Sequence, residues 1–173
     1  MKSVTIHGKR NTDKICGEPG HCIRSEASKY NFSFSTYSHR DQVGIVNNLY
    51  LDGDIEFKGE MTQILNKKIS GYKAQDRQKG ILDESRFVDR DGVLEHLVAS
   101  RLVCHYCNEQ VLFLYENIGE KKQWTLDRID NNLGHNHDNV VIACLGCNIQ
   151  RRDVNKDKFK FTKNLRIVKT SNN

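Results

Sequence analysis

The chain has 173 residues and a mass of 20.0 kDa, a length that suits one domain with an appendage and excludes several independent cores. Its 27 Lys and Arg against 22 Asp and Glu give a net charge of +5, and its mean hydropathy is −0.67. No apolar run approaches the roughly 20 residues of a membrane span, and the charged start lacks the apolar stretch of a signal peptide. We therefore expect an intracellular protein, neither secreted nor embedded in a membrane.

The charge is distributed unevenly along the chain. Residues 1–60 are neutral, residues 61–103 carry +2, residues 104–147 carry −3 and residues 148–173 carry +6. Phosphate contacts need Lys and Arg, whereas a hard cation needs carboxylates, so the pattern fits a nucleic-acid groove around a cation site. On charge alone, a solvated charged surface is the favoured interpretation.

Residues 1–60 are predicted to form a β-rich or irregular region. Aromatic and polar side chains alternate over residues 30–37, which is typical of a half-buried strand. Turns and short strands are expected around Gly44, Gly53 and Gly59.

Residues 61–102 are predicted to form a basic helical region. Apolar residues recur at helical spacing from Met61 to Tyr72, which predicts an amphipathic helix over 61–79 that could break at Gly71. A second helix is expected over 89–101, capped by Asp89 or Asp91. Four basic residues on or after the first helix are candidate contacts for DNA phosphates: Lys67, Lys68, Lys73 and Arg77.

Residues 103–173 are predicted to form a compact core with a basic C-terminal extension. Short apolar runs at 111–115, 123–128 and 139–143 predict strands, and the residues from Cys147 onward predict a short helix. Arg151 and Arg152 on that helix are further candidate DNA contacts. The basic tail is expected to continue along the DNA backbone, and a packed terminal strand or helix is the alternative for residues 158–169.

Two Cys-x-x-Cys pairs are the strongest signal in the chain. Cys104 and Cys107 form the first, Cys144 and Cys147 form the second, and 36 residues separate them. Two thiolates from one tight turn can occupy adjacent corners of a tetrahedron, so two such turns predict a closed structural Zn²⁺ site. Four unrelated thiols, or a redox pair, are the alternatives.

The other cysteines could belong to a second zinc site. Cys16, His21, Cys22 and His39 are suitable ligand types, but their spacing is irregular. Free thiols and surface histidines are the favoured interpretation for these four residues.

The segment 124–152, WTLDRIDNNLGHNHDNVVIACLGCNIQRR, together with the upstream CHYCN, resembles the zinc-containing HNH endonucleases, also called ββα-metal nucleases. Their pattern is a Cys-x-x-Cys, a strand ending in Asp-His, a loop, an Asn before an apolar strand, and a second Cys-x-x-Cys followed by Asn. Asp127-Arg128, Asn139 and Asn148 take the polar places here. The resemblance covers about 50 residues and is strongest to stand-alone nucleases of phages, large DNA viruses and rare-cutting restriction enzymes.

The resemblance implies an α+β fold, with a ββα-metal nuclease core behind a mixed N-terminal region that has one or two helices. It also implies that Asn139 holds the loop through backbone hydrogen bonds. Phosphodiester cleavage needs a cation on the phosphate and a base for the water, and Asp127 and Asn148 could supply oxygen ligands to a catalytic Mg²⁺ or Mn²⁺. Turn and capping duty is the alternative for these two residues.

The chain departs from the family where the general base is expected. The family has His after the Asp, and this chain has Arg128, whose guanidinium cannot accept a proton at neutral pH. Arg128 could instead clamp the phosphate. The candidate base is His135, after Gly134, with His137 as second choice; a solvent-facing loop histidine is the alternative for both.

The sequence thus predicts a metal-dependent DNA endonuclease. A zinc-stabilised nucleic-acid-binding module without activity is the first alternative, and a zinc-organised protein-interaction domain is the second. DNA is the expected partner, and the oligomeric state, with a homodimer as one option, is left open.

Overall fold

The computed structural model describes residues 29–30 and 32–165. Cys16, His21 and Cys22, three of the four residues considered for a second zinc site, lie outside this part of the chain, as does the end of the basic extension beyond residue 165. His39 lies inside it, and its Nε2 is 3.1 Å from the carbonyl oxygen of Leu102.

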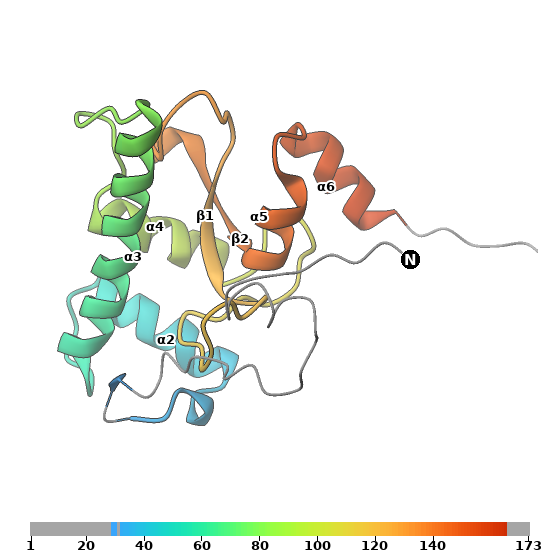
Figure 1. Cartoon of the computed structure of the whole chain (residues 1–173). Coiled ribbons are helices and arrows are strands. Elements are labelled where there is room, and N and C mark those ends of the chain that lie inside the picture. The colour runs from blue at the N-terminus through green and yellow to red at the C-terminus, as the bar shows by residue number, and fades with distance from the viewer. Residues whose placement is uncertain (1–28, 31, 166–173) are drawn as a thin grey trace, which may run out of the picture.

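The described residues form a mixed α+β fold, as predicted, with five α-helices and one two-stranded antiparallel sheet (Figure 1). The helices are α2 (His39–Tyr50), α3 (Lys58–Lys79), α4 (Arg90–Ser100), α5 (Leu145–Arg151) and α6 (Lys156–Asn164). The strands are β1 (Trp124–Arg128) and β2 (Val140–Cys144), and short 3-10 helices lie at Phe34–Thr36 and His137–Asn139. Among these helices, none is both long and apolar enough to cross a membrane.

The prediction of strands before residue 60 is wrong for the described part. Residues 34–36 form a 3-10 helix, and Gly44 lies within α2. The Ser38 side chain accepts a hydrogen bond from the Asp41 backbone while the Asp41 side chain accepts one from the Ser38 backbone, a capping box that starts α2. Ile45, Val46 and Leu49 then follow helical spacing and are buried, so the local signals select a helix.

The two helices predicted in the middle of the chain are present. α3 begins three residues before Met61, continues through Gly71 without a break, and ends at Gly80, whose φ of 68° is in the left-handed region. α4 begins after Asp89, whose side chain accepts a hydrogen bond from the Gly92 N–H. α4 packs chiefly against α2.

The two strands coincide with two of the three predicted apolar runs. Trp124 pairs with Cys144 at one end of the hairpin and Arg128 with Val140 at the other. Residues 111–115 are not a strand, because the side-chain Oε1 of Gln42 in α2 accepts the backbone N–H groups of Phe113 and Leu114.

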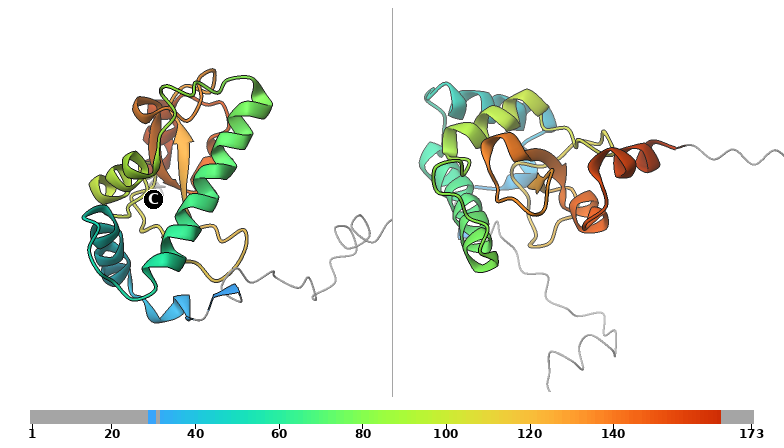
Figure 2. Two further views of the ribbon diagram at one scale, coloured as in Figure 1. Left: turned by 90° about the vertical axis from the view of Figure 1, so that its left-hand side faces the viewer. Right: turned by 90° about the horizontal axis from the view of Figure 1, so that it is seen from above.

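α5 follows β2 directly, and the basic extension begins with α6. Seen from the front and from above, α3 lies on the side of the hairpin opposite to α6 (Figures 1 and 2). Phe159 of α6 packs edge-on against Tyr106, with ring centroids 5.0 Å apart. The hairpin therefore lies between a long basic helix and the two C-terminal helices.

Candidate metal centre and adjoining cleft

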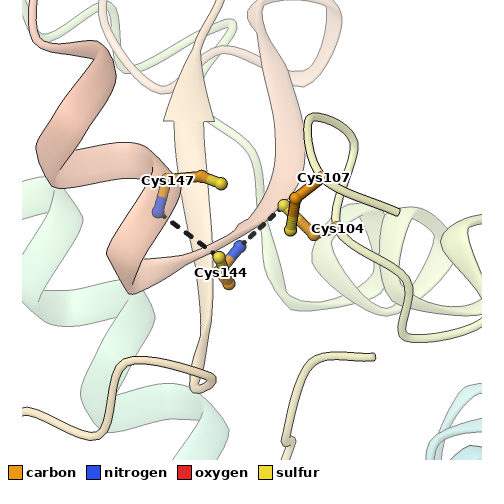
Figure 3. A group of neighbouring side chains, drawn as sticks. All are labelled: Cys104, Cys107, Cys144 and Cys147. Carbon is orange, nitrogen blue, oxygen red and sulfur yellow. Dashed lines mark hydrogen bonds between the residues drawn. The ribbon is translucent and has the colours of Figure 1, made fainter. Parts of the chain in front are cut away.

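The four paired cysteines come together at the end of the hairpin. Cys104 and Cys107 lie in the turn after α4, Cys144 ends β2 and Cys147 lies in α5 (Figure 3). Their sulfur atoms all lie within 4.8 Å of one another, and only Cys107 is not fully buried. A set of four sulfurs this close can hold a metal ion such as zinc.

Backbone N–H groups support the sulfurs. The Cys147 N–H donates to Cys144 Sγ and the Cys144 N–H donates to Cys104 Sγ, both over 3.3 Å. A hydrogen bond from the Cys144 thiol, together with backbone N–H groups, outweighs burial and lowers the pKa of Cys104 to about 4. The same hydrogen bond raises the pKa of Cys144, and burial raises that of Cys147, so metal binding must displace protons from these thiols.

A cleft of about 900 Å³ separates α3 from the hairpin and α5. α3 lines one wall with basic and aromatic side chains, among them Lys67, Lys68, Tyr72 and Lys79. Elsewhere the cleft is lined by five of the residues that the sequence singled out: Asp127, Arg128, His135, Asn148 and Arg152. Residues from a strand, a loop and a helix thus share one cavity.

Asp127 is buried beneath this cleft and bound by a partner that the sequence did not suggest. Arg151 donates from Nε to Oδ2 over 2.6 Å and from Nη2 to Oδ1 over 3.0 Å, and the Tyr106 hydroxyl also donates to Oδ2. An ionised carboxylate has about four acceptor positions, so one on Oδ1 remains. Asp127 therefore keeps limited capacity for a cation.

Arg151 is 1% exposed, which argues against the predicted DNA contact. Besides Asp127, its guanidinium donates to the carbonyl oxygens of Arg128 and Val154. Arg151 thus connects α5 to β1 from inside the protein. Arg152, the next residue, is exposed and lines the cleft.

The two asparagines of the motif have different surroundings. Asn139 donates to the carbonyl oxygens of Asp130 and Gly134 and accepts from the Asp130 N–H, each over 2.9 Å, which holds the loop between the strands. Asn148 donates from Nδ2 to Thr125 Oγ1 over 3.0 Å. Its Oδ1 accepts no hydrogen bond from the part of the chain that the structure describes. This oxygen is thus a second candidate ligand for a hard cation.

Arg128 is engaged by the same loop. Its Nη1 donates to the carbonyl oxygens of Asn131 and Leu133, both over 3.2 Å. The side chain lines the cleft, and within the described chain its Nε and Nη2 make no hydrogen bond. Arg128 can therefore hold the loop with one nitrogen and present the others to an anion.

His135 lies against α3, held by a carboxylate that the sequence did not single out. Its backbone N–H donates to Asp76 Oδ2 over 2.6 Å, and its Nδ1 is 2.8 Å from Asp76 Oδ1. Both side chains are almost fully buried, and Tyr72 of α3 packs on the imidazole with ring centroids 4.6 Å apart. Asp76 continues the buried stripe of α3 four residues after Tyr72, a spacing that could have revealed it.

His137 takes no part in the cleft. Its side chain is exposed, its Nε2 is 3.3 Å from Glu95 Oε2, and its ring lies beside that of His96. Only His135, of the two candidate bases, lines the cavity that Asp127 and Arg128 also line.

The basic residues of α3 fall into two groups. Lys67, Lys68 and Lys79 line the cleft, whereas Lys73 and Arg77 lie outside its lining, where both contact Glu84. The Lys68 ammonium donates to the Trp124 carbonyl oxygen and lies over the Trp124 ring, 4.3 Å from its centroid. Burial lowers the pKa of Lys68 to about 7. Lys68 thus contacts the hairpin as well as the cavity.

Gly134 gives a test of how closely this loop approaches α3. A Cβ at this position would lie 2.7 Å from the Ile81 carbonyl oxygen and 2.9 Å from Asp76 Oδ2. We expect Gly134→Ala to lower the free energy of unfolding by about 1–3 kcal/mol, because the loop must move away. Gly71→Ala is the control: a Cβ there meets no atom within 4 Å, and the variant should gain about 0.5–1 kcal/mol from helix propensity. Urea unfolding measures both, and equal effects would contradict the close contact.

No protein-family model, curated protein or solved structure matches this chain.

Proposed function

We propose that this protein is a metal-dependent DNA endonuclease, with a structural zinc ion and a catalytic Mg²⁺ or Mn²⁺. One observation carries the proposal: a hairpin and the helix that follows it bring Asp127, Arg128 and Asn148 to one cleft, which His135 also lines. The four cysteines close the end of this ββα unit, so a bound zinc fixes the strand and helix that carry the polar residues.

Each residue has a role in the proposed reaction. Oδ1 of Asp127 and Oδ1 of Asn148 are the oxygens left to hold the divalent cation, which when bound supplies charge stabilisation at the scissile phosphate. Arg128 binds a phosphate oxygen through the guanidinium nitrogens not bonded to the loop. His135 accepts a proton from the attacking water, so that the new P–O bond forms as the bond to the leaving oxygen breaks.

The alternative is a zinc-stabilised module that binds nucleic acid without cleaving it. The observation in its favour is that the Asp127 carboxylate already forms an ion pair with Arg151, so its negative charge is partly neutralised. Because that pairing weakens the attraction between Asp127 and a cation, we expect cleavage to need a high concentration of Mg²⁺.

The decisive experiment incubates the zinc-loaded protein with supercoiled plasmid in Mg²⁺, in Mn²⁺ and in EDTA. Cleavage that EDTA abolishes supports the endonuclease, and a gel shift without cleavage supports the binding module. The absence of both cleavage and a gel shift supports an interaction domain. His135→Ala should lose cleavage, and full activity in that variant contradicts its role. His137→Ala is the matched control and should stay active, because His137 lies outside the cleft.

Arg128 needs its own pair of variants. Arg128→Ala should be inactive both when the side chain clamps phosphate and when it only holds the loop. The Arg128→Gln variant removes the positive charge and keeps a shorter side-chain donor, so its stability must be measured beside its activity to show whether the loop is still held. Inactive but normally stable Arg128→Gln supports the clamp, whereas active Arg128→Gln contradicts it.

The cleft lysines should determine how DNA binding depends on salt. Replacing Lys67 and Lys79 by Gln should reduce the slope of log K against log salt by about 1.8, because each phosphate contact contributes about 0.9. Lys73→Gln with Arg77→Gln removes the same charge from two residues of α3 that do not line the cleft, and should change the slope less. Fluorescence anisotropy over a salt series measures both. Equal slopes in the two double variants would place DNA outside the cleft.

A further inference from the structure

Asp76 and His135 form a buried pair in which one carboxylate contacts both the backbone and the side chain of the histidine. Asp76 uses one carboxylate oxygen for the His135 backbone N–H and the other for the imidazole Nδ1. The peptide is also fixed from its other side, because the Val88 N–H donates to the His135 carbonyl oxygen over 2.9 Å. Both the backbone and the ring of His135 are therefore held in one orientation.

The same contacts define which imidazole nitrogen is available. An ionised carboxylate only accepts hydrogen bonds, so the Nδ1 that faces Asp76 carries the proton in the neutral ring. Nε2 then has the lone pair. Within the described chain it receives no hydrogen bond, and it is not among the buried atoms that lack a partner, so it reaches the cleft.

We propose that Asp76 is a positioning residue of the active site, which holds His135 in the Nδ1–H tautomer so that Nε2 can accept the proton of the attacking water. The inference rests on the proposed endonuclease function and adds to it a carboxylate from α3, outside the ββα unit. In the step itself, the water gives its proton to Nε2, its oxygen forms the bond to phosphorus, and the leaving oxygen departs with the electron pair of the broken P–O bond.

The surrounding charges suit a base that is neutral at pH 7. Burial lowers the pKa of His135, Asp76 opposes this, and the positive charges of Arg128 on β1 and Lys79 on α3 lower it further. Tyr72 packs on the ring from α3 as well. The cleavage rate should therefore fall only when the pH drops below the ordinary pKa of histidine, about 6.5.

Asp76→Asn tests the tautomer directly. The backbone N–H of His135 can only donate, so the amide oxygen of the substituted side chain must face it and the amide NH₂ must face Nδ1. The ring then shifts its proton to Nε2, which can no longer act as a base. We expect cleavage at pH 7 to fall by about 10²–10⁴-fold and to lose its histidine inflection, rising with hydroxide concentration instead.

Two readouts separate positioning from a purely structural role. Long-range ¹H–¹⁵N NMR should show the Nδ1–H tautomer for His135 in the wild type and the Nε2–H tautomer in Asp76→Asn; the His135→Gln spectrum assigns the signal. A structural role would lower the rate equally at every pH and keep the inflection. Asp54→Asn, at an exposed position, is the matched control and should change neither readout.

The outcomes separate this inference from the proposed function. A wild type that cleaves DNA while His135 is in the Nε2–H tautomer contradicts the role of Asp76 alone, even where Asp76→Asn fails to fold. Cleavage by Asp76→Asn with the wild-type pH profile contradicts it as well. A wild type that cleaves no DNA with any divalent cation contradicts the endonuclease proposal, whatever the tautomer.

Discussion

Replacement of Cys104 by serine is expected to unfold the part of the protein around the hairpin. Cys104 is fully buried and receives the backbone N–H of Cys144, so its sulfur links the turn after α4 to the end of β2. Zinc binding by four-ligand finger peptides contributes about 10–16 kcal/mol, whereas a whole domain is stable by only about 5–15 kcal/mol. The loss of one ligand therefore threatens the whole fold.

Metal content and thermal unfolding measure this effect together. The wild type should contain one zinc per chain in the described cluster and lose its cooperative transition when a strong chelator removes the metal. Cys104→Ser should bind zinc weakly and melt at a much lower temperature, or be recovered only as unfolded protein. A variant with full zinc content and the wild-type melting temperature would contradict a structural metal site.

A matched control uses the cysteines outside the described residues. The double variant Cys16→Ser, Cys22→Ser removes two sulfurs, one more than Cys104→Ser, and leaves the four-cysteine cluster intact. If these residues are free thiols, zinc content stays at one per chain and stability is unchanged. A fall in zinc content from two to one would instead establish a second metal site.

The parts of the fold predicted well are those set by local signals. The Cys-x-x-Cys spacing, the apolar runs that became β1 and β2, and the cap at Asp89 each depend on neighbours along the chain. α2 was also locally encoded, by the Ser38–Asp41 capping box and three buried apolar residues, but the aromatic alternation just before it favoured a strand. The aromatic side chains of this segment instead pack in a cluster, in which Phe32 stacks on Phe57 with ring centroids 4.6 Å apart.

The parts that could not be predicted depend on contacts between distant segments. Residues 111–115 have strand-like composition, yet Gln42, 71 residues away from Phe113, accepts the backbone N–H groups of Phe113 and Leu114. In the same way, the Asp76 partner of His135 is 59 residues away along the chain. A carboxylate on the buried stripe of a basic helix indicates that it has a partner, but periodicity alone does not say which.

Arg151 shows how the same limit affects the choice of functional residues. The pair Arg151-Arg152 has the composition of a DNA contact, but Arg151 is the last residue of α5, whereas Arg152 follows the helix with a left-handed φ of 53°. Arg151 is directed into the protein against Asp127, and Arg152 is exposed at the cleft. We therefore expect adjacent arginines to give opposite results when each is replaced.

Arg151→Met should lower the free energy of unfolding by about 3–5 kcal/mol, because the Asp127 carboxylate would remain buried without its counter-charge. Urea unfolding measures this change. Arg152→Met is the matched control, with a stability change within about 0.5 kcal/mol and weaker DNA binding. A stable Arg151→Met variant with reduced DNA affinity would instead support the phosphate contact predicted from the sequence.

Adding Asp127→Asn to Arg151→Met should restore part of the lost stability, because no unpaired charge then remains in the interior. The Tyr106 hydroxyl can still donate to the amide oxygen of the new residue. Recovery in the double variant would show that the ion pair, and not the shape of Arg151, accounts for the loss. It would also show that Asp127 has a structural role in addition to the proposed catalytic one, because the single carboxylate would both anchor α5 through Arg151 and face the cleft.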